Sequence, residues 1–520
     1  MQRRGFLATG AAMLAAPALA QKPQVLRMVP QANLTSLDPI WTTANITRNH
    51  AFMVYDTLYG LDAQLQPQPQ MAAGHVIEDD GRRVTITLRD GLMFHDGARV
   101  LARDCVASMK RWMVRNAFGQ KLATVTDSVA ALDDMRLEIR LRQPFPLLFS
   151  ALAVIGSACV IMPERLALTD PFKQVTDATG SGPFRYLASE FNSGSFVAYA
   201  KNERYVPRQQ PASFTAGGKP VFFDRVEWRI ITDAATSAAA LQNNEIDWFE
   251  QPPPELQDLL RRNQALVIET IDSRPNPAML RLNHLHPPFD NKAARQALFP
   301  AISQADFMSS IVGPDPAGWS TIGAFTPGTP LASDVGMQAL NGPRSLNRAK
   351  SLLREAGALA PRMRLIGPTD ILAPAAMTQV AGAMFHDLGM NMDLALSDWG
   401  TVIQRRASRE PVDKGGWSAL LTAFGSFDWV DPASHAVLRA NGLDAWFGWP
   451  TIPRLEQLRD AWFDAPNLAS QKVIAADMQR AMFDEVPFIP VGAYDSNTAL
   501  RKDLTARVSG FALFWNMKRG

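Results

Sequence analysis

Residues 417–435 read Trp-Ser-Ala-Leu-Leu-Thr-Ala-Phe-Gly-Ser-Phe-Asp-Trp-Val-Asp-Pro-Ala-Ser-His, and this stretch predicts a buried strand that runs into a polar turn. Its first half is mostly apolar without helical spacing, which favours a strand over a helix. The Gly425-Ser426 pair interrupts the apolar run, and Asp431-Pro432 is typical of a turn. The chain therefore places polar groups directly after a core strand.

Phe427, Asp428 and Trp429 lie between the apolar run and the turn. A carboxylate flanked by large aromatic rings at a strand end can form a partly desolvated anionic pocket, which suits a cation better than a neutral solute. The ring faces add cation–π attraction. The alternative interpretation is that Asp428 caps a turn and that the rings fill the core. The pattern alone leaves both interpretations open.

Strands and helices alternate along much of the chain. Residues 226–231 and 245–248 are predicted strands that flank an alanine-rich helix. The segments 363–367, 375–388 and 391–396 give another strand-helix-strand unit. This alternation predicts an α/β protein with sheets rich in parallel strands.

The segment between residues 62 and 180 has a different pattern of apolar and polar residues from the rest of the chain. Apolar and polar residues alternate in two runs, 84–88 and 137–141, and each run ends in turn residues. Between them, residues 102–114 have helical spacing with Asp104 in the first turn, where a negative charge is favourable. We therefore predict a small, separate α+β unit.

Two segments rich in glycine or proline are candidate hinges. Gly180 and Gly182 belong to a Gly-Ser-Gly-Pro-Phe segment, which lacks the glycine spacing of a dinucleotide loop and the lysine of a phosphate loop. We interpret it as a turn or hinge. Pro487 and Pro490 fix φ on both sides of a Phe-Ile pair, which suits a stiff crossover between structural units.

The first twenty residues have the three parts of an export signal. Arg3-Arg4 precedes an apolar run at 8–16 and a small-residue ending at 18–20, so we expect cleavage after Ala20. The paired arginines resemble the twin-arginine type, which predicts a periplasmic protein exported in its folded state. No later stretch reaches the roughly 18 uninterrupted apolar residues of a spanning helix, so we expect a protein that does not span the membrane.

Composition and motifs narrow the functional classes. Without Arg3 and Arg4, 50 basic residues face 50 acidic ones, so no basic field predicts binding to nucleic acid or anionic lipid. The sequence contains no Gly-x-Ser-x-Gly, His-Glu-x-x-His, Cys-x-x-Cys or phosphate-loop motif. We therefore predict no enzyme activity and no cofactor. His284 and His286 have metal-compatible spacing but no third ligand nearby, so we predict no metal site.

Cys105 and Cys159 are the only cysteines. An oxidising compartment permits a disulfide, but Cys105 lies in a predicted helix and Cys159 in an apolar run, where both can equally be buried free thiols. Sequence alone leaves the two possibilities open.

Short segments of the mature chain carry a further signal through their order and separation. They are Leu37-Asp38-Pro39, Asp56-Thr57-Leu58, Leu88-Arg89-Asp90-Gly91, Phe94-His95-Asp96-Gly97, Gly180-Ser181-Gly182-Pro183-Phe184, Asn283 with Pro288-Phe289-Asp290, and Val486-Pro487-Phe488. Together they resemble family 5 solute-binding proteins of ABC importers, the dipeptide, oligopeptide and nickel type. The resemblance implies two α/β lobes that close over a ligand, with an extra subdomain in the first lobe. It also implies a monomer that delivers a small solute or peptide to a membrane permease.

The resemblance also points to ligand-binding residues. In peptide-binding relatives, an Asp three residues before an Asp-Pro pair anchors the amino group of the peptide, and Asp428 holds that position here. The other predicted ligand-binding residues are Trp429, Trp417, Trp399, Phe427 and Asn45. Asn45 ends a loop at a predicted helix N-terminus, where exposed backbone donors can hold a ligand oxygen.

One departure from the dipeptide-binding pattern affects the expected ligand. Dipeptide-binding relatives supply an Arg for the peptide carboxylate from the loop before the preceding helix, whereas residues 369–375 contain no Arg. A buried carboxylate without a cation there would cost several kcal/mol. A longer peptide, an amine or an uncharged solute is therefore favoured over a free dipeptide.

The predicted division of the chain is a signal peptide at 1–20, lobe I at 21–61, 181–280 and 490–520, an extra subdomain of lobe I at 62–180, and lobe II at 281–489. The predicted function is capture of a peptide-like or cationic solute in an interlobe cleft for an ABC importer. The alternatives are the same fold binding a sugar or a metal complex, and a secreted hydrolase whose catalytic residues are dispersed along the chain.

Overall fold

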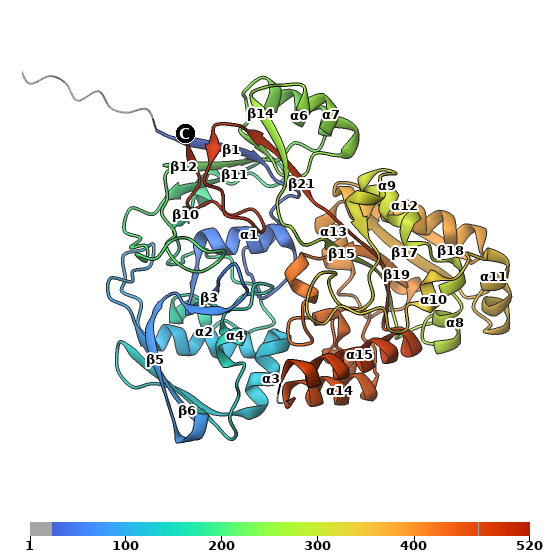
Figure 1. The fold of residues 1–520 in the computed structure, drawn as a ribbon, viewed down its shortest axis with the longest axis horizontal. Helices are drawn as coiled ribbons and strands as arrows, with labels where there is room; N and C mark the ends of the chain where they lie inside the picture. Colours follow the sequence, from blue (N-terminus) through green and yellow to red (C-terminus); the bar gives the residue numbers. More distant parts are fainter. Residues whose placement is uncertain (1–22, 466) are drawn as a thin grey trace, which may run out of the picture.

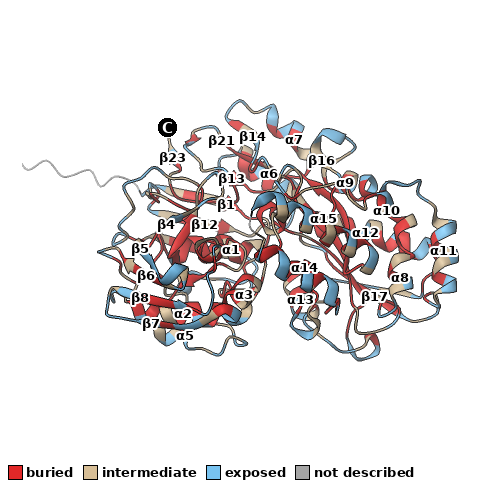
Figure 2. Ribbon diagram, turned by 60° about the horizontal axis from the view of Figure 1, so that its bottom comes forward, coloured by how far each residue is buried: buried red, intermediate tan, exposed pale blue. Residues whose placement is uncertain are grey.

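Two lobes lie side by side, each built on a β-sheet with helices packed against it (Figure 1). The computed structural model describes residues 23–465 and 467–520, so the predicted signal peptide lies outside the described residues. Figure 2 shows that buried residues concentrate in the sheets and on the inner faces of the helices. The predicted two-lobed α/β fold is confirmed.

The sheet of lobe I has seven strands. In spatial order they are β10 (Phe184–Tyr186), β11 (Phe196–Lys201), β12 (Arg225–Arg229), β1 (Val25–Val29), β13 (Trp248–Phe249), β21 (Asn497–Arg501) and β14 (Leu266–Thr270). The central strand β1 is parallel to β12 and β13, as the strand-helix alternation predicts. The outer strands are antiparallel, so only the middle of this sheet is parallel.

The helices of lobe I are α1 (Asn45–Val54), α6 (Ala234–Gln242) and α7 (Pro254–Arg261). Asp233 caps α6, because its carboxylate accepts a 2.7 Å hydrogen bond from the Thr236 backbone N–H. A buried ion pair fixes the loop before α1: Asp38 accepts hydrogen bonds from the Arg111 Nη2 at 2.6 Å and the Val175 N–H at 2.9 Å. This loop therefore has a defined position against the neighbouring subdomain.

The predicted α+β subdomain contains a four-stranded antiparallel sheet and four helices. The strands in spatial order are β5 (Ala72–Glu78), β6 (Arg83–Leu88), β8 (Arg136–Leu141) and β7 (Thr126–Ala131), and the helices are α2 (Ala102–Arg115), α3 (Ala117–Val125), α4 (Leu148–Leu152) and α5 (Glu164–Ala167). Val84, Ile86 and Leu88 are buried on one face, as their alternation predicts. Cys105 and Cys159 are both buried here as free thiols.

The sheet of lobe II has six strands, and helices cover it. In spatial order the strands are β16 (Trp319–Ser320), β20 (Phe488–Tyr494), β15 (Asn276–Leu282), β19 (Ala419–Ala423), β17 (Met363–Pro368) and β18 (Met392–Ser397). The helices are α8 (Lys292–Gln296), α9 (Gln304–Val312), α10 (Gln338–Asn341), α11 (Leu346–Glu355), α12 (Leu372–Asp387), α13 (Trp399–Arg405), α14 (Pro453–Phe463) and α15 (Leu468–Glu485). The apolar stretch before Gly425 forms β19, which lies between β15 and β17 in the middle of this sheet.

Among the described residues, three shorter ladders join segments that are distant in the sequence or close a turn. The strands β2 (Asp56–Thr57) and β9 (Val160–Ile161) pair antiparallel, as do β3 (Tyr59–Leu61) with β4 (Pro67–Pro69) and β22 (Leu504–Thr505) with β23 (Lys518–Arg519).

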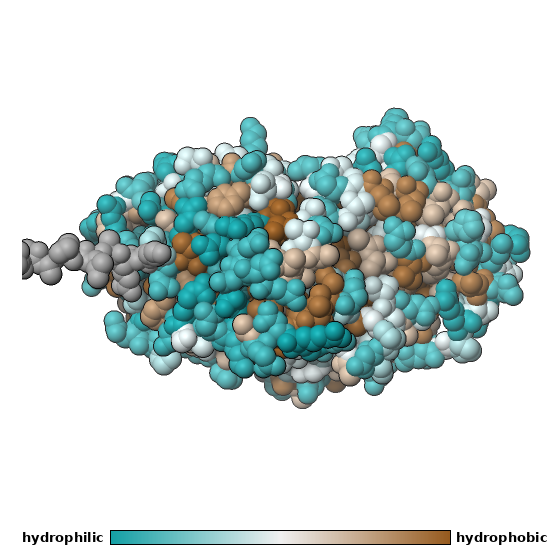
Figure 3. All heavy atoms as spheres, turned by 90° about the horizontal axis from the view of Figure 1, so that it is seen from above, coloured by the Kyte–Doolittle hydropathy of each residue, from teal (hydrophilic) through white to brown (hydrophobic). Residues whose placement is uncertain are grey.

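Figure 3 shows a mixed surface on the face viewed from above, with apolar side chains gathered toward the middle, where the lobes meet.

The chain passes between the two sheets through residues 271–275, which join β14 to β15, and through residues 495–496, which join β20 to β21. The predicted lobe boundaries at 280/281 and 489/490 fall inside β15 and β20. Pro487 precedes β20 and Pro490 lies within it, opposite Met279 of β15, so neither proline lies in a connection between the sheets.

Gly180 and Gly182 also lie away from these connections. A side chain at Gly180 would overlap the Val54 carbonyl group, and one at Gly182 would come within 2.7 Å of the Met53 carbonyl oxygen. Both glycines are therefore explained by close packing against the end of α1 inside lobe I. Neither glycine lies in the segments that connect the two sheets.

Candidate functional site

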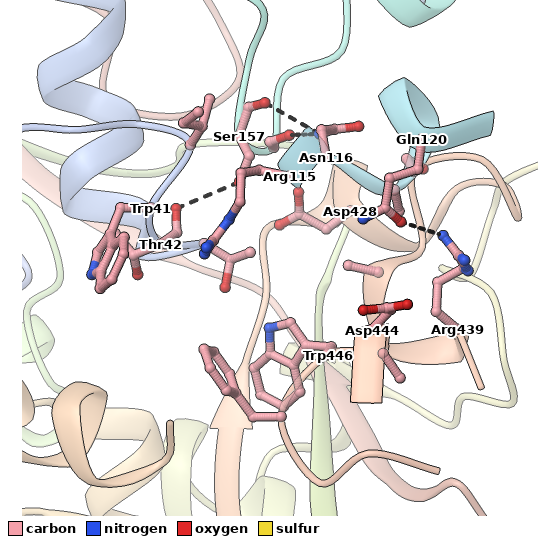
Figure 4. Close-up of a pocket in the computed structure, with 18 of the residues that line it drawn as sticks. Trp41, Thr42, Arg115, Asn116, Gln120, Ser157, Asp428, Arg439, Asp444 and Trp446 are labelled. Carbon is pink, nitrogen blue, oxygen red and sulfur yellow. Dashed lines mark hydrogen bonds between the residues drawn. The ribbon is translucent and has the colours of Figure 1, made fainter. Parts of the chain in front are cut away.

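A cavity of about 310 Å³ lies between lobe I with its subdomain and lobe II. Its walls come from the loop before α1, the junction of α2 and α3, the loop after α4, and two segments of lobe II. The lining includes Trp41, Thr42, Arg115, Asn116, Gln120, Gly156, Ser157, Asp428, Trp429, Arg439, Asp444 and Trp446 (Figure 4). This interlobe cavity is the candidate ligand site.

Asp428 reaches the cavity from a single turn that directly follows β19. The turn spans Ser426–Trp429, and the Gly425 N–H donates a 2.9 Å hydrogen bond to Asp428 Oδ2. Oδ1 faces Gly156 of the subdomain, where an added Cβ would lie 2.5 Å away. Gly156 therefore leaves room for the carboxylate between the lobes.

Asp428 makes no ion pair within 4 Å among the described residues. Burial raises the pKa of its carboxyl group, while the nearby Arg48 and the hydrogen bond from Gly425 favour the ionised form. A desolvated carboxylate without a direct counter-ion attracts a ligand cation. The geometry thus supports the anionic pocket predicted from the sequence.

Arg48 on α1 is the cation that faces this carboxylate. Its guanidinium lies 4.2 Å from the ring centre of Phe511, and burial lowers its pKa. Asp428, Glu250 and Asp272 surround it and oppose that shift. Arg274 pairs with Asp272 at 3.3 Å, which leaves Asp428 and Glu250 to face Arg48, so the cleft around Asp428 retains an anionic character when both carboxylates are ionised.

Glu250 is another buried carboxyl group beside Arg48. Only 6% of the residue is exposed, and burial raises its pKa to about 7. The Gln31 N–H at 2.7 Å and the Asn49 Nδ2 at 3.2 Å donate hydrogen bonds that limit the shift. Glu250 therefore changes charge near neutral pH.

Two of the predicted aromatic residues line cavities that the acidic side chains around Arg48 also line. Trp429 is fully buried, stacks on His435 at 4.6 Å between ring centres, and forms part of the wall of the 310 Å³ interlobe cavity. Phe427 packs 4.5 Å from the ring of Phe214 and lines a smaller cavity shared with Arg48. The structure brings both residues close to Asp428.

The other predicted residues lie differently. Trp417 is fully buried in the core, where its Nε1–H donates a 3.0 Å hydrogen bond to the Arg406 carbonyl, and it lines none of the described cavities. We therefore correct its predicted ligand contact to a core position. Trp399 begins α13 and lines two cavities between the lobes. Asn45 begins α1, as expected, and lines three small cavities.

With this geometry established, the comparison with known proteins is informative. A family model described as "Bacterial extracellular solute-binding proteins, family 5 Middle" matches residues 66–442. The chain belongs to this family. It is a solute-binding protein of the ABC importer type rather than an enzyme, in agreement with the resemblance seen in its short motifs.

This solute-binding protein is similar to two named relatives, to one of them over nearly its whole length. It is 36% identical to the "Probable peptide ABC transporter periplasmic-binding protein y4tO" of Sinorhizobium fredii, over 99% of this chain and 98% of that one. It is 28% identical to a glutathione-binding protein, GsiB, of Pectobacterium atrosepticum, over 69% of this chain and 66% of that protein.

Solved structures share the fold of this solute-binding protein. The periplasmic binding protein AgaA of A. tumefaciens R10, in complex with agropinic acid, matches with a TM-score of 0.79 and 18% identity, over 95% of this chain and 99% of that chain. A dipeptide-binding protein of Pseudoalteromonas sp. SM9913, in complex with Met-Leu, matches with a TM-score of 0.77 and 20% identity, over 96% of this chain and all of that chain.

Sequence reasoning missed the wall that the subdomain contributes to the site of this solute-binding protein. Arg115 at the end of α2 lies between the rings of Trp41 and Phe172, at 5.2 and 5.0 Å from their centres, and projects into the same space as Asp428 (Figure 4). Arg439 of lobe II donates a 3.1 Å hydrogen bond to Gln120 of α3 across the cavity. These contacts depend on how the lobes meet, which leaves no motif in the sequence.

The described residues also bear on the metal and membrane alternatives. In residues 23–465 and 467–520, no three His, Cys, Asp or Glu side chains gather in an arrangement that can hold a metal ion. His286 instead lies with its Nε2 2.9 Å from the Arg409 carbonyl oxygen. Across the same residues, no helix is both long enough and apolar enough to cross a bilayer.

Proposed function

We propose that this protein captures a peptide-like or cationic solute in the cavity between its lobes and delivers it to the permease of an ABC importer. The observation that carries the proposal is the Asp428 carboxylate, which lines the cavity and has no ion-pair partner within 4 Å among the described residues. A ligand ammonium group beside it would form a charge-assisted hydrogen bond in a site with little water.

The size of the cavity favours a short ligand. Its volume of about 310 Å³ is at the lower end of the range for small-molecule pockets, which is roughly 300–1,000 Å³. Lobe II provides Asp428, while lobe I and its subdomain provide Thr42, Arg115 and Gly156. Bending at residues 271–275 and 495–496 would open the cavity between these walls, and closure would exclude water from the ligand.

Similarity to named proteins supports the ligand class. The relative from Sinorhizobium fredii carries the name of a peptide ABC transporter binding protein, and the Pseudoalteromonas structure contains Met-Leu. We further propose that the protein reaches the periplasm by the twin-arginine route through residues 1–20, and that it acts there as a monomer.

Mass spectrometry of the purified mature protein tests this function. Native spectra would show the mass of any complex, and mild denaturation would release the ligand for identification. We expect a short peptide or an amine bound one-to-one. Parallel purification of Asp428→Asn should yield less of that ligand. A neutral glycan or a metal chelate bound at the same stoichiometry would contradict the proposed ligand class and keep the fold assignment.

An empty protein calls for a direct binding measurement. Defined pools of di- to tetrapeptides with free termini would then be added to the wild-type protein and detected in native spectra. Failure of every pool, and of simple polyamines, to bind at millimolar concentration would reject the proposed function.

A further inference from the structure

The subdomain of lobe I contacts lobe II on the side of the molecule opposite to the chain connections. In Figure 1, α3 of the subdomain lies beside α14 of lobe II at the bottom of the view, whereas β14 and β21, which lead into the connections at 271–275 and 495–496, lie toward the top. The two lobes are therefore joined covalently at one end and through side-chain contacts at the other.

Three aromatic rings form the centre of this contact. Phe463 at the end of α14 lies 5.7 Å from Phe118 of α3 and 5.9 Å from Phe145 of the subdomain, measured between ring centres. Phe118 and Phe145 also contact each other, at 6.1 Å. All three residues are more than nine-tenths buried. Rings from the two lobes thus shield one another from water.

Polar contacts between the same two helices, or close to them, surround the rings. They are Lys121 with Asp460 at 2.7 Å, Arg459 with the Ala117 carbonyl oxygen at 3.2 Å, and Arg439 with Gln120 at 3.1 Å. We call α3, α14, Phe145 and these contacts the clasp.

The rings contribute most of the stability of the clasp. The side chain of Asp460 is 62% exposed, so its ion pair with Lys121 adds little in water. Opening of the lobes would let water replace the hydrogen bonds of Arg459 and Arg439, which offsets most of their loss. The rings have no such compensation, because opening would expose apolar surface that the clasp buries.

A buried charge opposes closure of the lobes in the absence of ligand. Asp428 makes no ion pair within 4 Å among the described residues, and burial raises the pKa of its carboxyl group. A contact elsewhere between the lobes has to outweigh this cost if the lobes are to stay together without ligand. The clasp adjoins the same interlobe cavity, since Ala117, Gln120 and Arg439 also line it.

We propose that the clasp holds the lobes closed in the ligand-free protein, so that a solute enters and leaves through a less populated open state. This inference goes beyond the proposed function, because it concerns the resting state of the lobes and does not depend on the chemistry of the solute. For a solute that is held only by the closed lobes, the apparent Kd rises as the closed fraction falls. The subdomain thereby sets how firmly the protein retains its solute.

Distances between the lobes of the empty protein test the clasp. Bound solute would be removed by dialysis in mild denaturant, and native mass spectrometry would verify that the protein is empty. Spin labels on Lys110→Cys of α2 and Lys472→Cys of α15 would then report the distance between subdomain and lobe II by pulsed electron paramagnetic resonance. Both lysines are exposed and lie outside the clasp, and the two natural thiols are buried.

We expect the empty wild type to show one distance that matches the structure. Phe463→Ala should add a longer distance, with a ratio of closed to open molecules that is about 10- to 100-fold lower. Phe483→Ala is the matched control, because Phe483 is a buried ring that packs on Phe299 within lobe II. Its loss should destabilise lobe II and leave the distance between the lobes unchanged.

A milder variant keeps the test decisive if Phe463→Ala fails to fold by circular dichroism. Phe463→Leu retains an apolar side chain in lobe II but loses the ring contacts, and it should show a smaller rise in the open fraction. Any peptide that binds the wild type should also bind the opened variant more weakly, by the factor by which the closed fraction falls.

Two results would overturn the proposal: an empty wild type that shows mainly a longer distance than the structure, or an unchanged distance in every folded variant of Phe463. An unchanged peptide Kd in a variant with open lobes would overturn the role of the clasp in retention. The distance measurement uses the empty protein, so failure of every peptide to bind would reject the proposed function and leave the result for the clasp standing.

Discussion

Replacement of Asp428 by Asn is the most direct perturbation of the site. The substitution keeps the shape of the side chain, and the amide oxygen can still accept the hydrogen bond from the Gly425 N–H. It removes the negative charge that faces the cavity. Any loss of affinity for an amine ligand therefore reports the charge rather than a collapsed turn.

The structure sets the expected magnitude. Removing one partner of a buried, hydrogen-bonded charge pair typically costs about 2–5 kcal/mol of binding free energy. Arg48 already opposes part of the field of Asp428, and neighbouring Glu250 still attracts a cation in the variant, whereas Asp272 is paired with Arg274. We therefore expect a loss at the lower end, about 2–3 kcal/mol, which is roughly a 30- to 150-fold weaker Kd.

Calorimetry at pH 7 with the amine or peptide identified by mass spectrometry measures this loss. Asp431→Asn is the matched control, because Asp431 is also a buried carboxylate. Its carboxylate accepts a 2.8 Å hydrogen bond from the Ser434 N–H and does not line the cavity. Wild-type affinity should also fall as the pH drops through the raised pKa of Asp428, whereas Asp428→Asn should lack this dependence. A Kd within twofold of the wild type in Asp428→Asn would refute the charge-pairing argument.

Two further predictions concern stability. Glu250 has a folded-state pKa raised from 4.5 to about 7, so its ionisation lowers the free energy of unfolding as the pH rises between these values, by about 3 kcal/mol at most. Urea unfolding of Glu250→Gln should show a stability gain over the wild type that grows from pH 5 to pH 8, and an equal difference at both pH values would contradict it. Arg281→Met leaves four carbonyl oxygens without their donor and should cost about 3–5 kcal/mol, whereas a loss below about 1 kcal/mol would show that water replaces the guanidinium.

The strand and turn around Asp428 were predictable because their signals are local. An apolar run without helical spacing became β19 at the centre of the lobe II sheet, and the Gly-Ser break became the turn that presents Asp428. The subdomain was also predictable, since alternating residues at 84–88 form a sheet with one buried face. In each case the periodicity of one segment is sufficient to give its structure.

The aromatic residues and the hinge were harder, because their roles depend on what packs against them. Trp417 and Trp429 are both fully buried, yet Trp417 lines none of the described cavities while Trp429 borders the interlobe cavity. Gly180 and Gly182 look like hinge residues in sequence, but close contact with the α1 carbonyl groups explains both. A glycine in the sequence does not reveal whether the fold needs its backbone flexibility or its lack of a side chain.

The Asp428 carboxylate and the buried Arg406 both belong to lobe II. Trp417 links the carbonyl of Arg406 to the segment that leads into β19, and β19 ends at the turn of Asp428. The backbone at Arg406 and the turn of Asp428 therefore belong to the same packed part of lobe II. Lobe I adds the hydroxyl group of Thr42 at Arg406 and the space at Gly156 beside Asp428. A ligand cation at Asp428 would thus meet its counter-charge on lobe II before lobe I closes, and closure would strengthen that contact by removing water.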